Sequence, residues 1–168
     1  MNDDNLKEEY SVRIERDLKS GNVVREEWLN KDGRFHRFGD LPAVIEYCAK
    51  TGIQTYSAYY QHGLKHREND QPASIAVNAE TGNVFAATYA VKGNYHREGD
   101  QPAVILSDAQ TGKVIQHIYN KDGQCHRSLP NPAIQRFHSE TGKVLEEEYW
   151  VTGKKVSAPR STLKPSIG

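Results

Sequence analysis

Hydrophobic and polar residues alternate with a period of two in short runs over most of the chain, as in β-strands. In one such run Ile75 and Val77 fall on the same side of the strand. Between paired runs lies a turn that contains Thr-Gly, where glycine supplies the positive φ that a hairpin with a glycine bulge requires. Helical periodicity exceeds two turns nowhere. The pattern therefore predicts β-hairpins.

The hairpin pattern recurs every 30 residues, so the chain is a tandem repeat. We call a set of residues at the same position of successive repeats a column. Four columns are the same in every full repeat: Gly33, Gly63, Gly93 and Gly123; His36-Arg37, His66-Arg67, His96-Arg97 and His126-Arg127; Pro42-Ala43, Pro72-Ala73, Pro102-Ala103 and Pro132-Ala133; and Thr51-Gly52, Thr81-Gly82, Thr111-Gly112 and Thr141-Gly142. Such repeats stack because each buries its apolar face against its neighbours. We predict an all-β fold in which tandem 30-residue β-hairpin repeats form an open twisted antiparallel meander of about ten strands.

The repeat pattern also predicts the domain organisation. Residues 1–158 are expected to form a single β-hairpin repeat domain, with a degenerate capping repeat over 10–33 and full repeats over 33–153. Residues 159–168 are expected to form a basic C-terminal tail, and the beginning of the chain is acidic. We interpret both ends as solvated tails, with a docking arm as the alternative.

Tyrosine occupies one column in every full repeat, at Tyr59, Tyr89, Tyr119 and Tyr149. This column is predicted to form the aromatic ladder of the core, on the same side as the aliphatic columns. A platform on which a ligand stacks is the alternative.

Composition and charge narrow the possible partners. The chain has 168 residues, of which 36% are hydrophobic, and 22 basic residues balance 22 acidic ones. This balance gives no support to direct nucleic-acid binding or to an anionic membrane as partner. No apolar run approaches the 18 residues of a membrane span. Cys48 and Cys125 lie in different repeat columns, so we expect no disulfide framework and a cytoplasmic location.

The segment between hairpins carries the polar motif His-Arg-x-x-Asp-x-Pro-Ala. Its polar members are His36, Arg37, Asp40, His66, Arg67, Asp70, His96, Arg97, Asp100, His126 and Arg127. These side chains are predicted to form a knot of charge-assisted hydrogen bonds with a structural role. The fourth repeat lacks the aspartate, so its knot is expected to be weaker or redirected to a partner.

The motif does not predict a catalytic or metal site. Catalytic and metal sites are single constellations, whereas this group recurs in every full repeat. If the hairpins stack in one sheet, successive histidines lie roughly 9–10 Å apart, too far to share one ion. Neither cysteine has an independent His-Asp context, and no phosphate-binding loop is present. We therefore expect no enzyme activity and no cofactor.

The pattern Gly-x-x-His-Arg-x-x-Asp-x-Pro-Ala, followed by Thr-Gly and a strand ending in tyrosine, resembles the MORN-like hairpin repeats. Closest are those of YwqK-type antitoxin and immunity proteins and of HRxDGPA-like arrays. The resemblance covers residues 21 to about 153. It implies a binding module, in several cases one that is paired with a bacterial toxin.

Columns that differ between repeats indicate where a partner binds. We predict a protein partner, most specifically a cognate toxin such as a nuclease. Its contacts are expected at Glu146, Glu147, Glu148 and Trp150, with a second patch at Tyr56 and Tyr60. The alternative for the acidic run is an edge strand kept in solvent. Alternatives for the whole protein are a binder of glycans or anionic ligands in repeated His/Arg/Asp grooves, and a phage-borne inhibitor of host defence.

Overall fold

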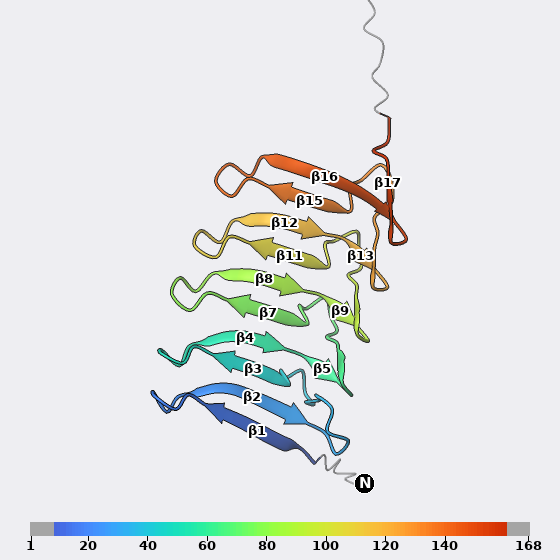
Figure 1. The fold of residues 1–168 in the computed structure, drawn as a ribbon. Helices are drawn as coiled ribbons and strands as arrows, with labels where there is room; N and C mark the ends of the chain where they lie inside the picture. Colours follow the sequence, from blue (N-terminus) through green and yellow to red (C-terminus); the bar gives the residue numbers. More distant parts are fainter. Residues whose placement is uncertain (1–8, 161–168) are drawn as a thin grey trace, which may run out of the picture.

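The computed structural model describes residues 9–160, and this range is all-β, with 17 strands and no helix (Figure 1). Eleven strands form one open antiparallel sheet in the order β1-β2-β3-β4-β7-β8-β11-β12-β15-β16-β17. They are β1 (Ser11–Arg16), β2 (Val23–Leu29), β3 (Val44–Tyr47), β4 (Gln54–Ala58), β7 (Ser74–Val77), β8 (Val84–Thr88), β11 (Val104–Ser107), β12 (Val114–Ile118), β15 (Ile134–Phe137), β16 (Val144–Val151) and β17 (Lys154–Val156). The predicted fold class is confirmed. Most of the basic tail and the acidic residues before Glu9 lie outside the described residues.

The Thr-Gly turns form the predicted hairpins with a bulge. In the second full repeat, Gly82 has a φ of 75° and its N–H donates to the Asn78 carbonyl at 2.9 Å. The Asn78 side chain accepts from the N–H of Glu80 at 2.8 Å, which holds the turn from within. The register between β7 and β8 shifts between Ala76 and Val77. The four full repeats have the same geometry here because all four place glycine where φ must be positive.

Each full repeat also ends in a second, shorter hairpin that the alternation of the sequence does not reveal. Three of these are separate two-stranded sheets. They are β5 (Tyr60–Gln61) with β6 (Leu64–Lys65), β9 (Ala90–Val91) with β10 (Asn94–Tyr95), and β13 (Asn120–Lys121) with β14 (Gln124–Cys125). β17 pairs only with residues 149–151 of β16 and ends the same column of hairpins (Figure 1). Strands of two residues are too short to show a period of two.

The two faces of the main sheet differ. The register places Tyr56 and Ala58 on one face, which we call the Tyr56 face, and Ile45 and Ser57 on the other, which we call the Ile45 face. The short hairpins reach over the Tyr56 face, because Lys65 Nζ lies 3.2 Å from Ser74 Oγ on that face. The main sheet is therefore flanked along one side by a second column of hairpins.

The core is thin. The alanines of the Pro-Ala column, Ala43, Ala73, Ala103 and Ala133, are fully buried at 0% exposure. No large side chain within residues 9–160 is fully buried. Small residues allow neighbouring strands and loops to pack closely, so backbone pairing and polar contacts between repeats supply much of the cohesion that a thick core supplies elsewhere.

The tyrosine column does not form the predicted ladder of rings. Arginine guanidinium carbons lie 3.7 Å above the ring centres of Tyr59, Tyr89 and Tyr119, and Trp28 takes the same role in the capping repeat, under Arg37. Each aromatic ring thus packs against a cation from the following His-Arg motif. The alternation of polar and apolar residues identified these aromatic side chains as inward-facing. It carries no information on which arginine packs on each ring, because that arginine lies eight or nine residues further along the chain.

Candidate functional site

Arginines of the His-Arg motif join each repeat to the one before it. Arg67 donates from Nε and Nη2 to the two carboxylate oxygens of Asp40, at 2.8 and 3.0 Å, and from Nη1 to the Pro72 carbonyl at 3.2 Å. The same bidentate pairs recur between Arg97 and Asp70 and between Arg127 and Asp100. The aspartate thus belongs to the preceding repeat and not to the arginine's own motif. We call these three pairs the Arg-Asp ladder.

The ladder has a clear electrostatic signature. Each arginine of the ladder is mostly buried, with about one seventh of its side chain exposed, whereas more than half of each aspartate side chain is exposed. Hydrogen bonds from the guanidinium groups lower the pKa of Asp40, Asp70 and Asp100. Each arginine is bound by a carboxylate, a carbonyl and an aromatic ring at once. These arginines therefore act as staples between repeats.

The two ends of the ladder explain the irregular repeats. In the fourth repeat Pro130 stands where Asp40, Asp70 and Asp100 stand in the others, and Ser157 stands where a following arginine would be. The aspartate is missing from the one repeat that no arginine follows. At the start, Arg37 stacks on Trp28 and donates to the Pro42 carbonyl at 3.2 Å, but no carboxylate between residues 9 and 160 pairs with it.

The histidines of the motif are also bound between repeats. Nδ1 of His66 accepts from the backbone N–H of Lys92 at 3.2 Å, in the turn of the next short hairpin. The equivalent bonds run to His36 from His62, to His96 from Asp122 and to His126 from Thr152, at 3.1–3.2 Å. These rings therefore position the next turn by accepting its backbone N–H.

No nucleophile or metal centre emerges from this region. Burial raises the pKa of the Cys125 thiol to about 11, so the thiol stays protonated at neutral pH. Its neighbour His126 is held by the turn at Thr152. Within residues 9–160 no group of three or more His, Cys, Asp or Glu side chains is arranged to hold a metal ion.

The predicted acidic patch is divided between the two faces of β16. Glu146 and Glu148 lie on the Tyr56 face, where Arg136 donates to both, at 2.6 and 2.9 Å. Glu148 also accepts from the Trp150 indole N–H at 3.0 Å. Glu147 lies on the Ile45 face and accepts from Gln135 at 3.2 Å.

Glu148 is the most strongly bound carboxylate of that run. Hydrogen bonds from Lys155, Arg136 and Trp150 lower its pKa to about 2, and only 12% of its side chain is exposed. Trp150 is half-buried. Only Glu146 and Glu147 therefore offer much accessible charge in this run.

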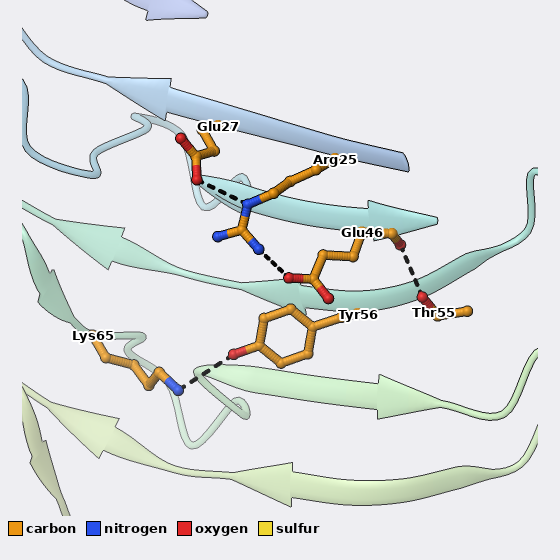
Figure 2. Close-up of polar contacts among 6 residues, drawn as sticks. All are labelled: Arg25, Glu27, Glu46, Thr55, Tyr56 and Lys65. Carbon is orange, nitrogen blue, oxygen red and sulfur yellow. Dashed lines mark hydrogen bonds and ion pairs between the residues drawn. The ribbon is translucent and has the colours of Figure 1, made fainter. Parts of the chain in front are cut away.

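The second predicted patch lies at the other end of the Tyr56 face. Lys65 Nζ lies 3.5 Å from the Tyr56 hydroxyl oxygen (Figure 2). The Tyr60 ring packs on Phe35, with ring centres 5.2 Å apart. Beside Tyr56, Glu46 binds Arg25, which also donates to Glu27 at 2.8 Å (Figure 2). The structure thus adds charged residues that sequence reasoning missed, since Arg25 lies in the degenerate repeat.

One row of residues across the Tyr56 face has a different residue at the equivalent position of each full repeat. It runs through Arg25, Glu46, Tyr56, Ala76, Ala86, Leu106, Gln116, Arg136 and Glu146. Charged side chains occupy both ends of the row and small or uncharged ones its middle. The column Glu46, Ala76, Leu106, Arg136 was not identified from the sequence, although its variation between repeats is visible there.

The fold defines an all-β tandem-repeat protein with two hairpins in each full repeat. Comparisons of the chain with protein-family models, with curated proteins and with solved structures gave no match. No helix in residues 9–160 has the length and apolarity to cross a membrane.

Proposed function

We propose that this chain is a non-enzymatic protein-binding module, and most specifically an immunity or antitoxin protein that binds and neutralises a cognate toxin in the cytoplasm. One observation supports this most directly. Equivalent positions of the row through Tyr56 carry a different residue in each full repeat, while the Arg-Asp pairs that hold the repeats together stay the same. A constant scaffold with a variable face is how repeat proteins present binding surfaces.

The Tyr56 face suits a partner with a mixed or basic surface. Glu146 is more than half exposed at one end of the row, and the tyrosines at the other end provide amphipathic contact area. Free cysteines at Cys48 and Cys125 agree with a reducing compartment. A toxin that acts on nucleic acid would carry basic charge, which favours association with the exposed carboxylate of Glu146.

Two neighbouring glutamines give a matched test of this surface. Gln116 in β12 lies on the Tyr56 face, and Gln135 in β15 lies on the Ile45 face; both are partly buried. The protein is co-expressed with the product of the adjacent gene, and complex formation is measured for Gln116→Arg and Gln135→Arg. We expect Gln116→Arg to weaken binding at least tenfold and to abolish protection in a growth assay, and Gln135→Arg to change neither. Equal binding by both folded variants would exclude the Tyr56 face.

Arg37 favours a second candidate function, the binding of an anionic ligand. Clefts lie between successive His-Arg motifs, and the first is lined by His36, Arg37, His66 and Arg67. Arg67 is already paired with Asp40, but the carboxylate-binding edge of Arg37 has no partner within residues 9–160. Titration with acetate and phosphate, followed by NMR of the arginine Nε–H signals, tests this. A shift confined to Arg37 supports an anion site, and no shift at any arginine rules it out.

A further inference from the structure

Both ends of the main sheet have a strand edge without a partner. Within residues 9–160, β1 pairs with β2 on one side and with no strand on the other (Figure 1). At the opposite end, residues 144–148 of β16 pair with β15 only. An unpaired edge presents backbone N–H and C=O groups that a further strand can bind.

The side chains of β1 distinguish its two faces. Arg13 and Glu15 lie on the Tyr56 face, and Val12 and Ile14 lie on the Ile45 face with 42% and 55% exposure. The strand thus offers charge on one face and accessible apolar area on the other. An added strand must match both.

Charges on the Tyr56 face already alternate from strand to strand at this end. Arg13 lies 3.8 Å from Glu27. Glu15 stands opposite Arg25, which in turn binds Glu46 (Figure 2). These residues form two rows of alternating charge across the strands, one through Arg13 and one through Glu15. A further strand continues both rows if it places an acidic residue beside Arg13 and a basic residue beside Glu15.

We propose that the added strand is β1 of a second copy of this chain, antiparallel to the first, with a two-fold axis at Ile14. In this register Arg13 of each copy faces Glu15 of the other, and the two Ile14 side chains meet on the opposite face. Both charge rows continue with alternating sign, and the exposed Ile14 side chains cover each other, while Val12 faces Arg16 of the other copy. The two main sheets become one continuous sheet. This interface does not depend on the proposed function.

Geometry leaves few other registers. Residues directly opposite each other in an antiparallel pair lie on the same face, so the two-fold axis must pass through a residue and not between two residues. An axis at Arg13 brings two arginines together, and an axis at Glu15 brings two glutamates together. Of the axis positions 13, 14 and 15, only Ile14 avoids like charges.

A head-to-tail filament is disfavoured by the charges on β16. Continuing the sheet register from β16 into β1 of a second copy would set Glu15 opposite Glu146 and Ile14 opposite Glu147. One row would then meet like charge, and another would set a carboxylate against an aliphatic side chain. Only Arg13 would meet an acid, Glu148, whose carboxylate is already bound by Arg136 and Lys155. The isologous β1 pair closes on itself, so association stops at the dimer.

The contact involves one short strand from each copy, so the dimer is expected to be weak and reversible. Sedimentation equilibrium of the whole chain between about 10 µM and 1 mM should show exchange between 19.0 kDa and twice that mass. Association should weaken as salt is raised, because both charge pairs lie at an exposed edge.

Two single variants test the register. Arg13→Glu places two glutamate pairs across the axis, and Glu15→Arg places two arginine pairs there, so each variant alone should dimerise at least about tenfold more weakly. In an equimolar mixture of the two variants every opposed pair has opposite charge. The mixture should therefore recover association to within about threefold of the unmodified protein. Lys50→Glu, on an exposed Thr-Gly turn, changes charge without touching β1 and should associate normally.

Each contrary outcome refutes the proposal. A protein that remains monomeric at the highest concentration has no such interface. Variants that keep their melting temperature but do not recover association on mixing exclude the Ile14 register. Species heavier than a dimer that become more abundant with Glu146→Arg, which replaces the repulsion between Glu15 and Glu146 by attraction, would show that copies join head to tail through β16.

Discussion

Replacing Asp70 should separate the contribution of the Arg-Asp ladder from that of the loop that carries it. Asp70 accepts two hydrogen bonds from Arg97, at 2.7 and 2.9 Å, and has a φ of 52°. Alanine at this position removes the ion pair and also forces a side chain without a compensating polar group into the left-handed region. Asp70→Asn keeps the preference for positive φ, and Asp70→Gly removes the side chain without steric strain.

The size of the effect follows from burial. The Asp70 side chain is 58% exposed and that of Arg97 is 14% exposed. An exposed ion pair contributes roughly 0.2–1 kcal/mol, and bidentate geometry places this one near the upper end. We therefore expect Asp70→Asn and Asp70→Gly to lower the free energy of unfolding by about 1 kcal/mol, and Asp70→Ala by about 2 kcal/mol because backbone strain is added. For a chain of this length, 1 kcal/mol corresponds to roughly 2–4 °C in melting temperature.

Thermal melts monitored by circular dichroism measure these shifts, and Asn131→Ala in the fourth repeat serves as the control with little expected change. Hydrogen exchange should show faster opening at the junction of the second and third repeats, because each repeat is stabilised by its neighbours. An unchanged melting temperature for Asp70→Ala, together with loss of partner binding, would refute the structural role of the ladder.

Three further predictions follow from the same contacts. Folding lowers the pKa of Glu148 and of the ladder aspartates, so their contribution to stability is present above the unfolded pKa of about 4 and is lost as pH falls through the folded values. Thermal melts should show a melting temperature that falls below about pH 4.5. A constant melting temperature would contradict the assignment of these ion pairs. His66→Ala should cost about 1–3 kcal/mol by leaving a backbone N–H without its acceptor. The same change at His138 should cost less in parallel melts, because its Nδ1 accepts from exposed N–H groups of Glu140 and Thr141, where water can replace it. Glu146→Lys should weaken toxin binding and reduce its salt dependence, whereas Glu147→Lys on the opposite face should not; equal losses by surface plasmon resonance would show that the whole edge binds.

The sequence by itself determined the repeat, the all-β class and the bulged hairpins. These follow from local rules. A period of two places side chains on alternate faces, and glycine after threonine marks the position where φ must be positive. About 15 consecutive residues of each repeat are therefore enough to predict its hairpin. The His-Arg and Asp residues were recognised as a polar group for the same reason, since they recur in one register.

Partners across repeats were decided only by the tertiary structure. Asp70 lies closer in sequence to Arg67 than to Arg97, yet it binds Arg97, because stacking brings the loop of one repeat beside the motif of the next. The short hairpins leave no alternation to detect, and the division of Glu146 and Glu147 between opposite faces depends on the register of β16. Contacts between residues about 27 positions apart are set by how neighbouring repeats stack. The sequence of a single repeat contains only one of the two residues in each such contact.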